Sequence, residues 1–244
     1  MRKWAASLGI FFLALAYLFA EDLTPEMLTG NIQKMYDGIT DYQCRFSEWC
    51  TKGSQREERT INYYFKRPRW IRMDIIAGNN WLDIGSAGVY KNDGKVSGRK
   101  GGILGFLPLR VRLSSPLATT LRGSRFDQSD LYATLEKLYF HLSGSAVSLE
   151  RLPNGLIQFS AIPRDPRLND GFSKDVLIID PATWLPQSSD SYEGDAVVQH
   201  AEWSHYICNA GLPDELFDVR WDAKRLAKSG IPSIHEVPVE MEKR

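Results

Sequence analysis

The sequence lacks the short motifs by which many enzymes are recognised. It has no GxSxG nucleophile elbow, because residues 85–88 (GSAG) are one residue short of that pattern, and it has no HExxH motif and no P-loop. The four histidines do not fall at metal-ligand spacing on a helix, and there is no CxxC pair. The sequence therefore predicts no catalytic residue, metal site or cofactor, with a hydrolase of unrecognised site as the alternative.

A net charge is also lacking. The 244 residues contain 30 Lys and Arg against 30 Asp and Glu, so no global positive field indicates nucleic acid as a partner. Hydrophobic residues make up 43% of the chain and charged residues 25%. This composition allows one large domain or two small ones with a substantial core.

Long apolar runs are confined to the N-terminus. Arg2 and Lys3 precede an apolar run that ends at Ala20, before an acidic pair. This order is typical of a secretory signal peptide, and we expect cleavage near Ala20 and export to the periplasm. The alternative is a retained membrane anchor, because ~17 apolar residues lie at the lower end of the spanning range.

Cysteine is scarce, with Cys44, Cys50 and Cys208 as its three instances. Cys44 and Cys50 lie six residues apart in a predicted extended segment, about 20 Å at the rise of a strand. A disulfide needs Cα atoms within roughly 7 Å, so this pair requires a sharp bend. Cys208 could pair with either of them if the last strand lies beside the first. Three unpaired, mostly buried thiols are the alternative.

Two segments have the apolar spacing of amphipathic helices. The first follows Thr24 and Pro25, a good N-cap and first helical residue, and its apolar residues recur at intervals of four, three and four. The second follows Asp130 with the same intervals. The two apolar stripes are Leu28, Ile32, Met35 and Ile39, and Leu131, Leu135, Leu138 and Leu142.

Most of the remaining chain alternates with the period of two that is typical of strands, from 42 to 96 and again from 146 to 208. Helix, strands, helix and strands in one run predict a single α+β domain, with helices packed on one face of a large antiparallel sheet. A sheet of about ten strands tends to curl. We place a signal peptide at 1–20, the domain at 21–230 and an irregular tail at 231–244.

One predicted hairpin has an unusual turn. Apolar alternation on both sides, from Tyr63 to Phe65 and from Ile71 to Ile75, flanks the basic turn Lys66-Arg67-Pro68-Arg69. Three cations thus lie beside a very apolar surface. Taken alone, Arg67 would be interpreted as a solvated cation of the turn.

This hairpin and several later motifs resemble the periplasmic lipoprotein carrier family (LolA). The stretch FKRPRWIRMD, residues 65–74, is similar to its K/R-R-P-x-x-[FI]-R-[WM] hairpin, and residues 91–96 are similar to its dG-x-x-v turn. Residues 115–123 resemble its P-x-x-x-L-L-x-G helix start, with Thr120 in place of the first Leu. The stretches 176–195 and 209–219 resemble its Asp-Pro hairpin and its closing N-x-x-x-P-D-x-x-F. The matches are short but follow the order of the family.

The resemblance implies an unclosed, strongly curved antiparallel β half-barrel with helices packed on its concave face and an acyl-chain cavity between them. It implies a monomeric periplasmic carrier of lipidated proteins or lipids, which loads at an inner-membrane release complex and unloads at an outer-membrane acceptor. Neither an enzyme nor a nucleic-acid partner is implied. The alternative function is a lipid- or lipoprotein-sensing module of the cell envelope with the same fold.

The resemblance also suggests site residues. Arg67 matches the arginine that ties the lid helices over the cavity in the family. The candidates for the acyl-chain cavity, for which ordinary core under a helix is the alternative, are Tyr63, Phe65, Ile71, Met73, Met35 and Leu135. A glycine-flanked apolar loop between basic stretches is a candidate lid or membrane-contact loop, with burial as a plain loop as the alternative. Its apolar residues are Ile103, Leu104, Phe106 and Leu107.

Overall fold

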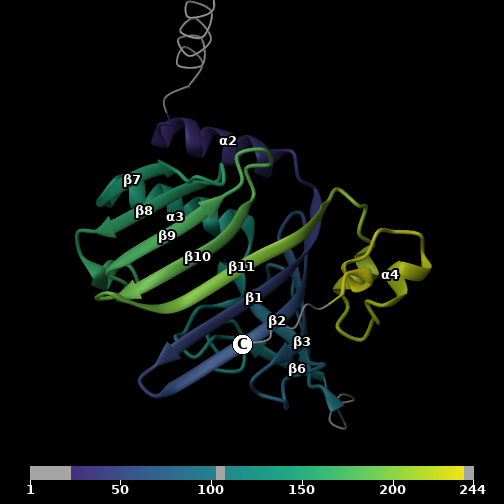
Figure 1. The fold of residues 1–244 in the computed structure, drawn as a ribbon. Helices are drawn as coiled ribbons and strands as arrows, with labels where there is room; N and C mark the ends of the chain where they lie inside the picture. The colour runs from purple at the N-terminus through teal and green to yellow at the C-terminus, as the bar shows by residue number, and fades with distance from the viewer. Residues whose placement is uncertain (1–22, 103–107, 239–244) are drawn as a thin grey trace, which may run out of the picture.

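The structure is a computed structural model that describes residues 23–102 and 108–238. The predicted signal peptide and the candidate loop residues Ile103, Leu104, Phe106 and Leu107 lie outside the described residues. Eleven strands form one sheet in the order β6-β5-β4-β3-β2-β1-β11-β10-β9-β8-β7 (Figure 1). They are β1 Asp41–Lys52, β2 Gln55–Lys66, β3 Trp70–Gly78, β4 Ala87–Tyr90, β5 Lys95–Arg99, β6 Pro108–Arg112, β7 Ser145–Arg151, β8 Ile157–Pro163, β9 Lys174–Ile179, β10 Pro186–Glu193 and β11 Ala196–Cys208.

The sheet is antiparallel and curved, and its end strands β6 and β7 are not joined to each other in the described structure. The predicted half-barrel is therefore confirmed. The last strand lies beside the first, with Tyr42 of β1 opposite Cys208 of β11. Even so, Cys44, Cys50 and Cys208 are all free thiols, which selects the unpaired alternative.

Both predicted helices form on the inner, concave face. Helix α2 spans Pro25–Asp37, and its N-cap Thr24 accepts a hydrogen bond from the Met27 amide at 3.1 Å. Helix α3 spans Leu131–Gly144, and its N-cap Asp130 accepts from the Ala133 amide at 2.7 Å. Their apolar stripes pack on the inner residues of β8 and β9. None of the helices in the described part of the chain is long and apolar enough to cross a bilayer.

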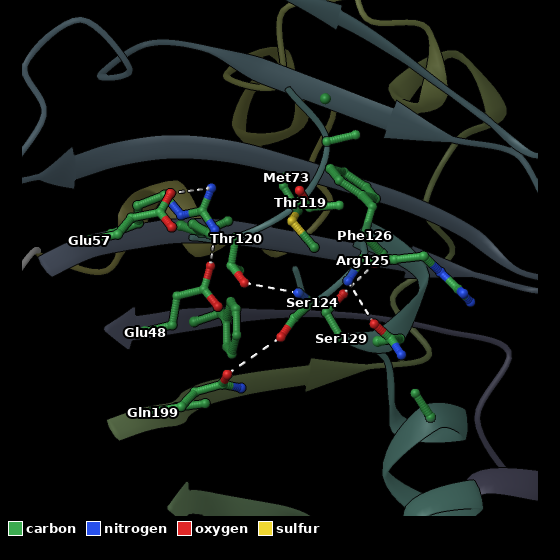
Figure 2. A pocket seen from close by; sticks show the side chains of 18 of the residues that line it. Glu48, Glu57, Met73, Thr119, Thr120, Ser124, Arg125, Phe126, Ser129 and Gln199 are labelled. Atoms are coloured by element: carbon green, nitrogen blue, oxygen red, sulfur yellow. Dashed lines mark hydrogen bonds and ion pairs between the residues drawn. The ribbon is translucent and has the colours of Figure 1, made fainter. Parts of the chain in front are cut away.

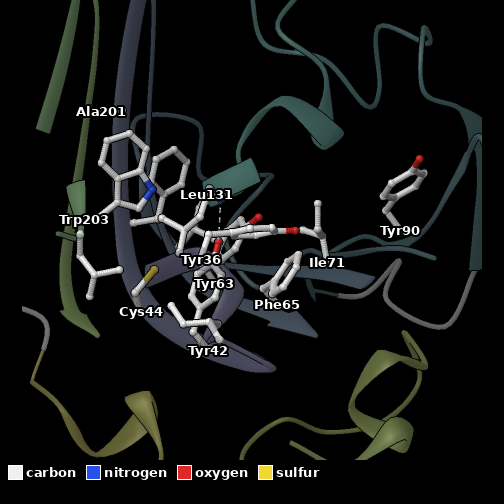
Figure 3. Close-up of a cluster of buried hydrophobic side chains, with 14 residues drawn as sticks. Tyr36, Tyr42, Cys44, Tyr63, Phe65, Ile71, Tyr90, Leu131, Ala201 and Trp203 are labelled. Carbon is white, nitrogen blue, oxygen red and sulfur yellow. Dashed lines mark hydrogen bonds between the residues drawn. The ribbon is translucent and has the colours of Figure 1, made fainter. Parts of the chain in front are cut away.

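A second apolar core covers part of the inner face where β1, β2 and β3 meet (Figure 3). Alternate residues of these strands point inward, and the aromatic rings stack, with 5.1 Å between the ring centroids of Tyr42 and Phe65. The ring centroids of Tyr42 and Tyr63 lie 5.7 Å apart, and these two rings are also stacked. This core anchors the end of the half-barrel next to α2.

The outer face of β2, β3 and β4 is covered by the C-terminal segment, residues 209–238 (Figure 1). This segment contains two 3-10 turns, Asp214–Phe217 and Ile234–Glu236, and a short helix α4, Arg225–Lys228. Leu216, Leu226 and Ile234 are fully buried on Tyr64 and its neighbours. The residues from 231 to 237, which the sequence assigns to an irregular tail, thus contribute to the outer core.

The segment that joins β6 to α3, residues 113–129, crosses the inner face, and we name it the covering loop. The expected helix start at residues 115–123 is wrong, because these residues form turns. The Leu121 amide, which a helix would use internally, donates to the Glu57 carboxylate at 2.7 Å. Thr119 and Arg125 form an antiparallel bridge instead, and Gly123 between them has a positive φ of 91°. A short 3-10 turn, Phe126–Gln128, follows.

Candidate functional site

A cavity of about 510 Å³ lies between the inner face of the sheet and the covering loop with α3 (Figure 2). Its volume falls within the ~300–1,000 Å³ that is typical of small-ligand sites. Strands β1–β6 and β8–β11 form its floor and sides, and the covering loop and α3 form its roof. The described structure therefore leaves open space between the sheet and the segments that cover its inner face.

One wall of the cavity is apolar because inward positions of β3, β5 and β6 carry aliphatic side chains. These lining residues are Met73, Ile75, Val96, Leu109 and Val111. Phe126 of the covering loop closes on this wall at Gly88, where an added Cβ would lie 2.9 Å from its ring. A glycine at this position thus lets the roof approach the sheet. The wall offers hydrocarbon contact without a hydrogen-bonding partner from these side chains.

The opposite wall is polar. Ser189, Ser191 and Gln199 of β10 and β11 line it, as do Lys137 of α3 and Asp175 of β9. Ser124 of the covering loop lies with its hydroxyl 3.4 Å from the Gln199 amide oxygen (Figure 2). The cavity is thus amphipathic, and it suits a ligand that joins hydrocarbon to a polar group.

Three charged residues at one end of the cavity form an ion-pair group. Arg59 lies 2.5 Å from a Glu48 oxygen and 3.3 Å from a Glu57 oxygen. Burial alone would lower the pKa of Arg59, but the two carboxylates raise it, so the guanidinium keeps its charge. The second oxygen of Glu57 accepts the Leu121 amide of the covering loop. This group therefore fastens the roof to β2.

Arg122 provides the second attachment of the covering loop. Its guanidinium donates to the Thr51 carbonyl oxygen at 2.5 Å and forms an ion pair with Glu193. It also lies over the ring of Phe172, 5.2 Å from the centroid. The roof is thus attached by polar contacts that can break without leaving a large apolar surface exposed at the attachment points.

A buried polar cluster surrounds Asp175. Its carboxylate lies 2.7 Å from the Lys137 ammonium and 3.1 Å from Nε2 of His141. Ser191 and Asn169 also donate to it. Burial would raise the pKa of Asp175, but the hydrogen bond from His141, the charge of Lys137 and the Ser191 bond together hold it well below its usual range. The cluster ties α3 to β9 and β10 beside the polar wall.

The basic turn between β2 and β3 lies beside the helices rather than over the cavity. Arg67 donates to the carbonyl oxygens of Ile39 and Tyr36 at 2.6 and 2.7 Å, at the C-terminal end of α2. Its guanidinium also lies 4.4 Å from the centre of the Tyr36 ring. Arg67 thus ties a helix as the resemblance implies, although that helix is absent from the lining of the cavity.

Arg69, two residues later, binds the helix that does form the roof. It lies 2.8 Å from the carboxylate of Asp130, the N-cap of α3, and donates to the Asp127 carbonyl oxygen at 2.7 Å. Asp130 is fully buried. Arg69 is one of the three cations of the predicted basic turn, but the sequence predicts no role for it, although its position across Pro68 from Arg67 was a usable signal.

The structure places the six candidate cavity residues in two environments. Met73 lines the cavity. Tyr63, Phe65 and Ile71 are fully buried in the aromatic core (Figure 3). Leu135 of α3 is buried against β8 and β9. Met35 packs against both cores. For these five, the alternative of ordinary core under a helix describes the structure, because packed neighbours occupy the space beside them.

The charged residues that line the cavity were not among the predicted site residues, although the alternation of side chains along the strands could have identified them. Glu48 has the same parity as Phe46, and Glu57 and Arg59 have the same parity as Ile61 and Tyr63. Charges on the inward parity of strands predict a polar patch inside the sheet. Among the described residues, no group of three or more His, Cys, Asp and Glu side chains is placed to hold a metal ion.

No protein-family model matches the chain, and no curated protein matches its sequence. Among solved structures it is similar to an uncharacterized conserved protein of Thermus thermophilus, with 12% identity, coverage of 81% of this chain and 93% of that chain, and a TM-score of 0.50. It is also similar to a DUF1329 family protein of Desulfovibrio piger (15% identity, 80% and 95% coverage, TM-score 0.45). A LolA superfamily protein of Nitrosomonas europaea is a third (11% identity, 80% and 97% coverage, TM-score 0.38).

At these identities a likeness concerns the fold alone. The open order of the strands and the helices on the inner face agree with the unclosed half-barrel that the sequence predicts. A likeness of fold does not identify a ligand, so the chemistry of the ligand is inferred from the cavity.

Proposed function

We propose that the chain binds the acyl part of a lipid or of a lipidated protein in this cavity and carries it through the cell envelope. The observation that supports this proposal is the amphipathic cavity of about 510 Å³ under a roof attached by polar contacts. Burial of hydrocarbon yields ~0.8 kcal/mol per methylene, so ten methylenes give roughly 8 kcal/mol for binding. The apolar wall around Met73 and Val96 supplies the surface for this burial.

The roof explains how such a ligand could enter a soluble carrier. An open trough would expose its apolar wall to water, whereas the covering loop shields it. Ligand entry requires the loop to lift, which breaks the bonds of Glu57 to the Leu121 amide and of Arg122 to Thr51 and Glu193. Exposed polar groups released in this way can bond to water, so the net cost is modest.

The proposal includes export and exchange partners, and these rest on the resemblance of the motifs. In this proposal residues 1–20 direct export and are removed near Ala20, and residues 21–230 form the carrier domain. Loading at an inner-membrane release complex and transfer to an outer-membrane acceptor follow from the same resemblance. N-terminal sequencing of the exported protein tests the first step, because a chain that still begins at Met1 would contradict it.

The experiment that tests binding is uptake of an apolar fluorescent probe, with mass spectrometry of lipids that co-purify. Ala133 of α3 lines the cavity, so Ala133→Phe should reduce probe uptake several-fold by filling it. Ala146 on β7 is exposed and outside the lining, and Ala146→Phe is the matched control. Equal uptake by both variants, or no uptake by the unmodified chain, would overturn the proposal. The lipid-sensing module, which needs no transported load, would then be the better interpretation.

A further inference from the structure

A short loop between β3 and β4 exposes a cluster of large apolar side chains. Trp81 is 77% exposed and Leu82 is 56% exposed, and Ile84 two residues later is also exposed. These residues belong to a hydrogen-bonded turn, in which the Asn80 side chain donates to Asp83 at 2.7 Å and accepts from the Leu82 amide at 3.2 Å. The apolar side chains are therefore held outward by a defined turn.

This turn is joined to the end of the β5–β6 hairpin. The Lys100 ammonium lies 2.6 Å from the Asp83 carboxylate, and the Gly101 amide donates to the Ser86 hydroxyl at 3.0 Å. An added Cβ at Gly101 would lie 2.0 Å from the Ile84 carbonyl oxygen, so the two segments are in close contact. Exposed Leu109 of β6 pairs with Gly98 on the neighbouring strand. The turn and the hairpin thus form one surface.

The charge of this region differs from that of the whole chain. Residues 81–112 contain six Lys and Arg against two Asp, whereas the complete chain is neutral. The two Asp residues are both paired, Asp83 with Lys100 and Asp93 with Arg110. The remaining excess is positive. Anionic lipid headgroups attract such cations by about 1 kcal/mol each, and Trp is enriched at the boundary between headgroups and hydrocarbon.

The same surface adjoins the cavity. Asn80, Asp83, Lys100 and Leu109 all contribute to the lining described above. A bilayer in contact with Trp81 and Leu82 would therefore lie next to one end of the cavity. An acyl chain that left such a bilayer would have a short path through water.

We propose that the turn at residues 79–86, together with strands β5 and β6, docks the protein on an anionic bilayer surface. Trp81 and Leu82 enter the headgroup region, while the cations of β5 and β6 contact the headgroups. Docking itself rests on exposure and charge, and its role in loading the cavity rests on the proposed function.

The test is co-flotation of the exported chain, residues 21–244, with vesicles of phosphatidylcholine, with and without phosphatidylglycerol. We expect binding to the anionic vesicles that weakens with salt. The Trp81→Ser/Leu82→Ser variant should bind about tenfold more weakly, and so should Arg110→Ser/Arg112→Ser. Leu168 is 73% exposed outside this surface, and Leu168→Ser is the matched control, with binding unchanged.

Three results would overturn docking. They are no flotation of the unmodified chain with anionic vesicles, an equal loss in Leu168→Ser, and retention of binding in both double variants. If the unmodified chain instead self-associates through Trp81, with no affinity for vesicles, the surface is an interface between copies. Probe uptake in the absence of vesicles separates the two proposals. Flotation without probe uptake would contradict the proposed carrier function and still support docking. Probe uptake without flotation would contradict docking and still support the carrier function.

Discussion

Arg67 and Arg69 flank Pro68 in one turn and bind the two inner helices at opposite ends. Arg67 donates to carbonyl oxygens at the C-terminal end of α2, and Arg69 pairs with Asp130 at the N-terminus of α3. The Arg67 cation at the carboxyl end of α2 and the Asp130 anion at the amino end of α3 both match the helix dipole, and Arg69 pairs with that anion. One basic turn therefore positions both helices through two of its three cations, and the third, Lys66, pairs with Asp214 of the C-terminal segment.

The first prediction concerns Arg67. Arg67→Gln should lower the free energy of unfolding by about 2–3 kcal/mol, because two charge-assisted hydrogen bonds to backbone carbonyls are lost. Arg67→Lys should recover part of this loss, since an ammonium can reach one carbonyl but cannot bond both through a planar fork. Urea unfolding measures the difference. If Arg67→Gln lowers the free energy of unfolding by less than about 0.5 kcal/mol, Arg67 is a solvated cation of the turn.

The second prediction concerns the pair of Arg69 and Asp130. Arg69→Met should cost about 3 kcal/mol, because it leaves the fully buried Asp130 carboxylate without its partner. Asp130→Asn keeps a good N-cap and removes the charge, so it should cost less than Asp130→Ala by about 1 kcal/mol. A double-mutant cycle by urea unfolding measures the coupling. Additive single effects would show that the two side chains act independently.

The third prediction concerns pH and Asp175. Its pKa is lower in the folded chain than in the unfolded chain, where it is about 3.9. Its contribution to stability is therefore present above the unfolded pKa and is lost as the pH falls through the folded pKa. Asp175→Asn should cost about 3 kcal/mol at neutral pH and progressively less as the pH falls below about 4. Thermal unfolding across this range measures it, and a constant difference would contradict the prediction.

The fourth prediction concerns His235 on the outer face. Burial lowers the pKa of its imidazole, and the nearby positive charges of Lys224 and Arg72 act in the same direction, against Asp74 and Asp222. Tyr64 and Asn62 bond its two ring nitrogens at 2.8 and 3.0 Å.

Because this pKa lies below its unfolded value of about 6.5, the contribution of His235 to stability is complete above that pH and is lost as the pH falls through the folded pKa. We expect the protection factors of the amides in residues 212–237, which are corrected for the intrinsic exchange rate at each pH, to fall on acidification. His235→Gln should flatten this dependence. The same pH profile in the variant would assign the effect to other groups.

The fifth prediction concerns the roof of the cavity. Glu57→Ala/Arg122→Met removes two of the attachments of the covering loop, so the apolar probe should enter and leave several-fold faster with its equilibrium binding less affected. Stopped-flow fluorescence measures the two rates. Arg167 is exposed and pairs with its neighbour Asp165, so Arg167→Met serves as the control. Unchanged rates would show that the ligand enters by another route.

The sequence predicted the local features that depend on interactions between residues a few positions apart. The N-caps Thr24 and Asp130 and the apolar stripes behind them located both helices, and period-two alternation located the strands. The open half-barrel followed from the order of the motifs that resemble a known family. Residues 115–123, which resemble a helix start, form turns instead, and the Glu57 carboxylate that accepts the Leu121 amide comes from a strand distant in the chain.

The sequence by itself determined the parity of the strands, and with it which side chains share a face of the sheet. Tertiary structure alone decided which of these inward side chains meet a ligand. Tyr63 and Met73 are direct neighbours on β2 and β3 and point the same way, yet Tyr63 is sealed by stacked rings and Met73 lines open space. A cavity remains where segments that are distant in the chain pack without filling the space between them. The spacing of residues within one segment does not indicate how the other segments pack against it, so the sequence pattern alone does not locate the cavity.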